Sequence, residues 1–201
     1  MTHHENLYTT PLLSNDDEWF EAMGLWGGFS HYVDDQGRNW VYVPTWGPVS
    51  KQAPKFPMTN GPNPNGSVMG FTVADHPDTG KPYLKAEWVS GDFAVPEPVV
   101  VANDVVFALS NGENAQQSVN AGIMPFGKFN REELLKDDVR TESKQVAQLR
   151  ALDALTGKTL YDSGPGVFES WAHFSGIAVA DGQVYAVDFS STLYCFGLKE
   201  D

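Results

Sequence analysis

Acidic, amide, aromatic and histidine side chains gather in three short stretches of the sequence. The six candidates are Asp92 and Glu97 in SGDFAVPEP (90–98), Glu113 and Asn114 in SNGEN (110–114), and Trp171 and His173 in ESWAHFSG (169–176). Carboxylates serve in metal binding and acid–base chemistry, and amide and carboxylate oxygens together suit calcium. Histidine can act as a base or contact a ligand near neutral pH, and tryptophan offers a planar surface for stacking.

Each candidate also has a purely structural interpretation. Asp92 and Glu97 can be solvated turn residues, and His173 can hydrogen-bond to a neighbouring unit of the fold. Trp171 can be wedged between two such units. Comparable positions in the first part of the chain are held by Trp26, His31 and Trp46.

Several other kinds of chemistry are excluded by the sequence. It contains no Gly-x-Ser-x-Gly, no phosphate-binding glycine loop with lysine, no Gly-x-Gly-x-x-Gly and no His-Glu-x-x-His. Cys195 is the only cysteine, so an intrachain disulfide, a disulfide of adjacent cysteines and a cysteine-rich zinc site are not available. The formal net charge of −13 disfavours binding to nucleic acid or to anionic membranes. No secretory signal opens the chain, and no stretch approaches the roughly 18 apolar residues of a membrane span.

A repeated pattern of strands positions the candidate residues. Three segments, 26–46, 96–112 and 173–191, each consist of an apolar strand, a polar turn and a second apolar strand. Their turns, Asp34-Asp35-Gln36-Gly37, Asn103-Asp104 and Asp181-Gly182, are built from residues that tolerate positive φ. Further strands follow each hairpin, over 67–91, 146–164 and 191–200. The pattern predicts an all-β chain of about eleven strands, in two four-stranded units and a third unit with three strands.

The predicted organisation is an N-terminal extension, 1–23, followed by units 24–91, 92–164 and 165–198. Two insertions, 47–66 and 112–145, fall between the second and third strands of their units and therefore project from the same face. The first is predicted to be an irregular loop, and the second favours a short helix over 130–140. Insertions gathered on one face often form a binding face, although a decorated but inert rim is the alternative.

One sequence motif carries a family resemblance. ALDALTGKTLY (151–161) resembles the repeat of the pyrroloquinoline-quinone-like (PQQ-like) β-propellers, which runs Ala-x-Asp-x-x-Thr-Gly-Lys-x-x-Trp across the last hairpin of a blade. The matching residues are Ala151, Asp153, Thr156, Gly157 and Lys158, with Tyr161 in place of the final Trp. We expect Gly157 to supply a left-handed turn, Asp153 to accept backbone hydrogen bonds, and the closing aromatic to pack between blades.

A second, looser copy of the motif lies at VADHPDTGKPYLKAEW (73–88), with two extra residues before Thr79-Gly80-Lys81 and its aromatic at Trp88. The resemblance covers about residues 24–198. It implies a partial propeller of about three blades, the last lacking its outer strand, and a periplasmic or cell-surface location. Quinoprotein dehydrogenases of this family carry PQQ, calcium, an aspartate base and a disulfide of adjacent cysteines. No stretch here matches the calcium or base motifs, so PQQ and calcium rest on the resemblance alone.

Two functions remain open at this point. The first is a non-catalytic binding or scaffold module that acts through its loop-bearing face, and we prefer it because the cofactor machinery is missing. The second is a fragment of a PQQ-dependent alcohol or sugar dehydrogenase whose cofactor residues lie in further blades. Because one fold hosts unrelated functions, the resemblance does not decide between them. The partner is then another protein or the upstream blades of a larger propeller. Alternatively, residues 5–20 complete the third unit and chains associate to close the ring.

Overall fold

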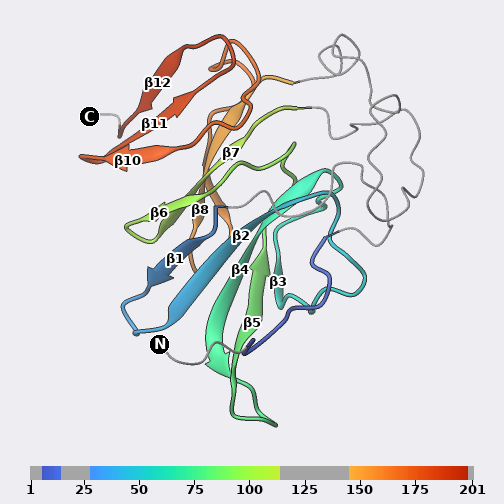
Figure 1. Cartoon of the computed structure of the whole chain (residues 1–201). Helices are drawn as coiled ribbons and strands as arrows, with labels where there is room; N and C mark the ends of the chain where they lie inside the picture. Colours follow the sequence, from blue (N-terminus) through green and yellow to red (C-terminus); the bar gives the residue numbers. More distant parts are fainter. Residues whose placement is uncertain (1–5, 15–27, 114–144, 199–201) are drawn as a thin grey trace.

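All regular structure in the described part of the chain is β-strand. The computed structural model describes residues 6–14, 28–113 and 145–198 (Figure 1). Twelve strands form three separate sheets, and no helix occurs in these ranges. The prediction of an all-β chain is therefore confirmed. The described residues also include no helical segment with the length and apolar character needed to cross a membrane.

The first sheet has five strands. Four of them form an antiparallel meander, and the fifth joins its outer edge in parallel orientation. In spatial order they are β1 (Ser30–Val33), β2 (Asn39–Trp46), β4 (Gly66–Asp75), β5 (Pro82–Val89) and β3 (Met58–Thr59). Strand β3 lies inside the insertion 47–66, so the prediction of a wholly irregular loop was wrong at these two residues. A two-residue strand has no alternating pattern from which to recognise it.

The second and third sheets have four and three strands, in sequence order and antiparallel throughout. The second sheet consists of β6 (Val100–Ala102), β7 (Val105–Ser110), β8 (Gln148–Asp153) and β9 (Thr159–Asp162). The third consists of β10 (Ala178–Ala180), β11 (Gln183–Val187) and β12 (Leu193–Phe196). The helix predicted over 130–140 lies outside the described residues.

The hairpin turns have the backbone conformation expected from their residues. Asn103 and Asp104 have φ of 50° and 61°, and Asp181 and Gly182 have φ of 51° and 74°. Two consecutive positive values are the signature of the tight hairpin turn whose twist matches that of the flanking strands. The Asp and Asn side chains tolerate this conformation, which explains why short polar residues mark these turns in the sequence.

The two copies of the PQQ-like motif form the same turn. In one copy the amide of Gly157 donates to the carbonyl of Asp153 at 2.8 Å, and in the other Gly80 donates to His76, also at 2.8 Å. Asp153 Oδ1 accepts from Thr156 N at 2.8 Å, as expected, whereas His76 Nδ1 accepts from Asp78 N at 3.2 Å. His76 thus takes the place that Asp153 has in the first copy. The two turns have the same length, so the two extra residues expected before Thr79 are not part of the turn.

A core rich in aromatic side chains joins the first sheet to the second. Trp88 is fully buried, and its Nε1 donates to the carbonyl oxygen of Ala154 in the second sheet at 2.9 Å. Its ring covers Gly70 on one side and Gly157 on the other, where a Cβ atom would lie 2.3 Å and 2.2 Å from ring atoms. Trp88 therefore packs between sheets, whereas Tyr161, the aromatic of the other copy, is 46% exposed.

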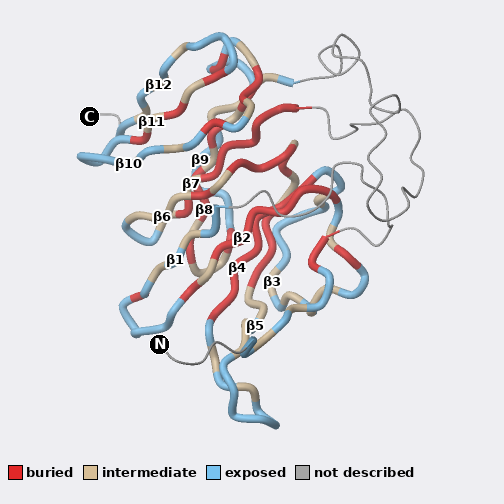
Figure 2. Tube along the Cα trace, in the orientation of Figure 1, coloured by how far each residue is buried: buried red, intermediate tan, exposed pale blue. Residues whose placement is uncertain are grey.

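A second core joins the second sheet to the third. Leu109 and Leu149 project from the second sheet towards Val184 and Ala186 of the third, and Phe168 packs against Tyr194 with ring centroids 4.5 Å apart. Neighbouring residues of β7 alternate between the two cores, because successive side chains in a strand point to opposite faces. The buried strands run through the middle of the molecule in Figure 2.

The outer face of the first sheet is covered by other parts of the chain. Leu13 is buried against Val43 and Phe71, and Phe56 packs on Phe71 with ring centroids 5.5 Å apart. Ser14 pairs with Val49, which brings the N-terminal segment and the insertion together. The described part of the N-terminal segment, 6–14, therefore lies on the first sheet. The alternative in which residues 5–20 complete the third unit was wrong for these residues, because Leu13 is buried on the first sheet and Ser14 pairs with Val49.

Candidate functional site

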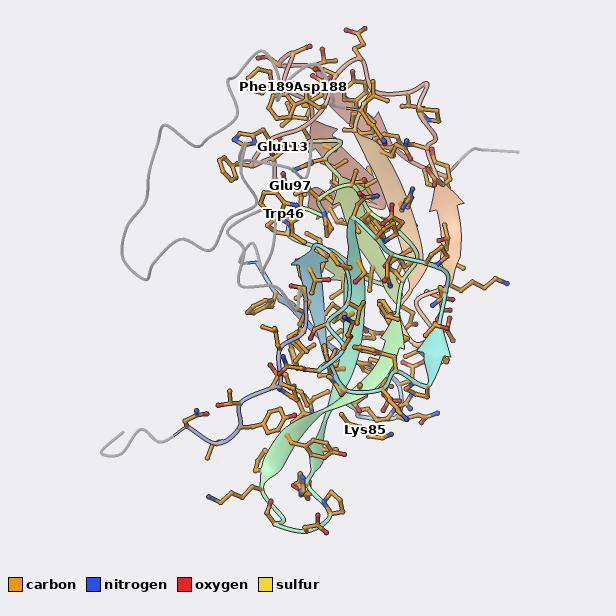
Figure 3. The ribbon with its side chains drawn as sticks, turned by 90° about the vertical axis from the view of Figure 1, so that its right-hand side faces the viewer. Trp46, Lys85, Glu97, Glu113, Asp188 and Phe189 are labelled. Atoms are coloured by element: carbon orange, nitrogen blue, oxygen red, sulfur yellow. The ribbon has the colours of Figure 1, made fainter. Side chains whose placement is uncertain are left out.

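The candidate site lies at the end of the sheets where β2, β7 and β11 finish. Figure 3 shows Trp46, Glu97, Glu113 and Phe189 following one another along this end, while Lys85 lies far from it. Glu97 precedes the first strand of the second sheet, Glu113 follows β7 by three residues, and Phe189 lies two residues beyond the end of β11. The insertions 47–66 and 112–145 both begin at this end, because each follows the second strand of its unit.

Backbone pairing fixes Glu97 and Asn111 beside each other. The amide of Glu97 donates to the carbonyl oxygen of Leu109 at 2.9 Å, and the amide of Asn111 donates to Val95 at 3.0 Å. The Asn111 side chain then contacts both glutamates of the site. Its Nδ2 donates to Glu97 Oε1 at 3.0 Å, and its Oδ1 accepts from the amide of Glu113 at 2.7 Å.

Gly112 allows the chain to turn between Asn111 and Glu113. Its φ is +78°, and a Cβ atom at this position would lie 2.3 Å from the carbonyl oxygen of Gln145. The carbonyl oxygen of Gly112 also accepts from the amide of Gln145 at 2.6 Å, which holds the two ends of the insertion together. Only glycine adopts this conformation without strain while leaving room for so close an approach.

His173 reaches the site from the segment that leads into the third sheet. Its Nδ1 lies 2.9 Å from Glu113 Oε2, and their side chains are 26% and 7% exposed. The amide of Ala172 donates to the carbonyl oxygen of Asn111 at 2.7 Å, which fixes this segment on the second sheet. The site is therefore assembled from two sheets, and neither sheet contains all of it.

Three aromatic side chains, Trp171, Phe174 and Phe189, lie around the Glu113–His173 pair. The Trp171 ring stacks on Phe189 with centroids 4.6 Å apart, and it lies 5.3 Å from the His173 ring. The His173 ring lies 3.9 Å from Phe174. Phe174 and Phe189 are 64% and 60% exposed, so the site presents apolar ring surface to solvent. Phe174 has φ of +52°, a conformation unusual for a bulky residue and one that is found most often at functional positions.

The environment of Glu97 favours its protonated form. Burial raises the pKa of Glu97, and hydrogen bonds from Asn111 and from the amide of Phe174 oppose this rise only in part. The charge of Glu113 adds to the rise, while His173 lowers it. Glu97 thus takes up a proton more readily than an exposed glutamate does. Any cation that reaches its carboxylate will stabilise the ionised form.

A partly open recess lies between these groups. It is small and shallow, with room for about one group the size of a water molecule, and it is continuous with solvent. Its wall is formed by Val95, Pro96, Glu97, Asn111, Glu113 and Phe174. The carboxylates of Glu97 and Glu113 and the ring of Phe174 make this recess suited to a positively charged group, because both kinds of group attract cations.

Asp188 stands close to this end of the third sheet but has a structural role. It is buried, and its carboxylate accepts hydrogen bonds from the amides of Ser170 and Thr192 and from the Tyr194 hydroxyl. Burial alone would raise its pKa, but these hydrogen bonds outweigh burial and lower it. Asp188 therefore fastens the segment that carries Trp171 to the third sheet.

Four of the six candidates predicted from the sequence come together here: Glu97, Glu113, Trp171 and His173. Asp92 does not join them, since its carboxylate accepts from the amide of Asn65 at 2.8 Å and holds the end of the first insertion. His31 is exposed on β1 and hydrogen-bonds to Asn39, and Trp46 is buried at the end of β2. Asn114 and Trp26 lie outside the described residues.

Sequence reasoning missed three members of the site, Asn111, Phe174 and Phe189. Asn111 lies in the same SNGEN stretch as Glu113, and this closeness in the sequence could have identified it as a member of the site. Within the ranges 6–14, 28–113 and 145–198, no group of three or more His, Cys, Asp or Glu side chains is arranged to hold a metal ion.

The geometry thus defines an all-β protein with an acidic, aromatic recess between its second and third sheets. No family model, curated protein or solved structure matches the chain.

Proposed function

We propose that the chain is a non-catalytic binding module of the PQQ-like propeller type, and that its recess binds a cationic group such as a lysine side chain of a partner protein. The observation that carries this proposal is the Glu113–His173 pair beside the buried Glu97, with the exposed ring of Phe174 lining the recess. The fold assignment is supported by the motif at 151–161 and by the matching turns of its two copies.

Charge and aromatic character act together in this proposal. An ammonium group over an aromatic ring gains about 0.5–2 kcal/mol, depending on how far it is desolvated. A hydrogen bond to an ionised carboxylate adds about 1.5–3 kcal/mol. The same features disfavour PQQ at this recess, because the quinone carries carboxylates of its own and the recess presents Glu97 and Glu113. The residues here do not fit that cofactor.

Calorimetric titration with two matched peptides tests the proposal. Gly-Gly-Lys-Gly-Gly is compared with the same peptide acetylated on its lysine, which removes the charge and keeps most of the shape. We expect saturable binding of the charged peptide and at least about 10-fold weaker binding of the acetylated one, since about 1.4 kcal/mol is a factor of ten. Equal heats from both peptides would refute cation recognition.

Two variants of equal charge change localise the binding. Glu113→Gln removes a carboxylate from the recess, whereas Asp78→Asn removes one from an exposed hairpin of the first sheet. We expect about 10-fold weaker peptide binding for the first variant and no change for the second. Equal weakening by both would show that only the overall negative charge attracts the peptide.

The pH dependence has a definite sign. The pKa of Glu97 is raised, so part of its population is protonated above the usual carboxyl range, and a bound cation favours loss of that proton. Binding should therefore strengthen as pH rises and should release protons, seen as heats that depend on the ionisation enthalpy of the buffer.

The dehydrogenase alternative is tested by titrating the protein with PQQ and calcium. Stoichiometric uptake of the quinone would overturn the non-catalytic assignment.

A further inference from the structure

The three sheets pack in a row, so the first and the third sheet each have one outer face, and only that of the first sheet is covered by other described residues. On the first sheet, Val43, Met69 and Phe71 lie beneath Leu13 and Phe56 and are almost fully buried. On the third sheet, the face turned away from the second sheet is not covered by any described residue. We call this the open face, and it consists of Ala178, Ala180, Tyr185, Val187, Leu193 and Cys195, together with the uncharged but polar Gln183 opposite Ala180.

Strand register establishes that these residues share one face. Tyr185 pairs with Ala178 on one side and with Cys195 on the other, and Val187 pairs with Leu193. Side chains directly opposite each other in an antiparallel pair lie on the same face. The intervening residues Val184, Ala186 and Phe196 belong to the inner core, so the open face points away from it. Leu193 is 68% exposed.

The open face carries no charge. Strands β10, β11 and β12 contain no Asp, Glu, Lys or Arg. Strands of the other two sheets do, with a Lys85–Glu87 ion pair on β5 and an Arg150–Asp162 pair on β8 and β9, both at 2.8 Å. An exposed, largely apolar surface without charges is typical of a site of association with another chain. In a chain of net charge −13, an uncharged face is also where like-charge repulsion between two copies is weakest.

We propose that the open face is a dimerisation surface, which packs on the same face of a second copy around a two-fold axis. Sheet-on-sheet packing is already the way this chain buries its other apolar faces. Head-to-tail stacking would require the outer face of the first sheet, and that face is occupied. When the same face of two identical chains is buried in their contact, the two chains are related by a two-fold axis. This inference does not depend on the recess or on its ligand.

Sedimentation velocity on the full chain tests the proposal. We expect the wild-type protein to sediment as a dimer and Leu193→Glu to weaken dimerisation at least about 100-fold, because each dimer loses two buried leucines and gains two facing charges. Leu160→Glu is the matched control, since Leu160 is 56% exposed on β9, outside the open face. A monomeric wild-type protein at high micromolar concentration, or a control that dissociates equally, would overturn the proposal.

Cys195 provides a second readout that separates dimerisation from misfolding. As the only cysteine, it reports the open face alone when it reacts with a maleimide. We expect slow labelling at concentrations where the dimer forms and fast labelling on dilution, with Leu193→Glu fast at every concentration. Protection of Cys195 in a protein that sediments as a monomer would overturn the proposal, because another part of the same chain would then cover the face.

Discussion

Gly157 and Gly80 occupy equivalent positions in the two copies of the motif and form a natural pair for mutation. Both have positive φ, +69° and +65°, so alanine at either position must adopt a left-handed conformation that costs about 1–2 kcal/mol. Their surroundings differ. Nothing lies within 4 Å of a Cβ atom placed on Gly80, whereas one placed on Gly157 would lie 2.2 Å from Trp88 Cε3.

The difference predicts unequal costs for the same substitution. Gly80→Ala should lower the free energy of unfolding by only the backbone cost of about 1–2 kcal/mol. Gly157→Ala must also displace the Trp88 ring, and overpacking of this kind adds about 1–3 kcal/mol. Shifting the ring also weakens the 2.9 Å hydrogen bond from Nε1 to Ala154, worth about 1 kcal/mol. We therefore expect Gly157→Ala to be about 2–4 kcal/mol more destabilising than Gly80→Ala.

Urea denaturation followed by far-ultraviolet circular dichroism measures both costs. The midpoints give the difference directly, provided that the slope of free energy against urea is the same for all variants. In a Trp88→Phe background, which removes Cε3 and Cζ3 but keeps a ring carbon near the place of Cδ2, the extra cost of Gly157→Ala over Gly80→Ala should shrink without vanishing. Equal costs for the two glycine variants in the wild-type background would refute the inference that Trp88 locks the first sheet onto this turn.

Two further predictions concern buried carboxylates. Burial alone would raise the pKa of Asp34, but hydrogen bonds from Trp40, Arg38 and Gln36 lower it to about 2. Because the folded-state pKa lies below the unfolded value, this stabilisation is present at neutral pH and is lost as pH falls from 3.8 towards 2. Asp34→Asn should therefore be less stable than wild type at pH 7, and the urea midpoints should converge in acid; a constant gap would contradict this. Glu97 has the opposite sign, since its raised pKa makes stability greatest below the usual carboxyl range and weaker as pH rises. Glu97→Gln keeps the acceptor for Asn111 and should raise the midpoint at pH 8 but not at pH 4, and a uniform change would argue against burial as the cause.

The sheets were largely predictable because their signals are local. Alternating apolar residues and turns such as Asn103-Asp104 and Asp181-Gly182 are properties of a few consecutive residues, and they fix both the strands and the hairpins. The covering of the first sheet was not predictable in this way. Leu13 and Phe56 lie in segments without periodic pattern, and only the three-dimensional structure shows that they meet Phe71.

The sequence indicated which types of residue form the candidate site, but it did not indicate the full set of residues that belong to it. Glu97, Glu113 and His173 were recognised because carboxylates and imidazole are uncommon beside apolar strands. Asp92 is also a carboxylate, so the sequence does not distinguish it from the glutamates of the site. In the structure it accepts a hydrogen bond from the backbone of Asn65 and lies outside the site. Phe174 was missed because its left-handed conformation is rare for phenylalanine, and no residue pattern indicates it.

The third sheet connects the proposed binding site with the proposed dimerisation surface. Glu113 follows β7 of the second sheet, and His173 precedes the third sheet, so a group bound beside this pair should stabilise the contact of the two sheets. Strand β11 carries Tyr185 and Val187 on its open face and leads directly into Asp188, which fastens the segment bearing Trp171. This sheet has only three strands, fewer than either of the others, so it gains most from any contact that orders it. The proposed recess lies at one end of this sheet and the open face on its outer side, so we expect a ligand at the recess to lower the ordering cost of association through the open face.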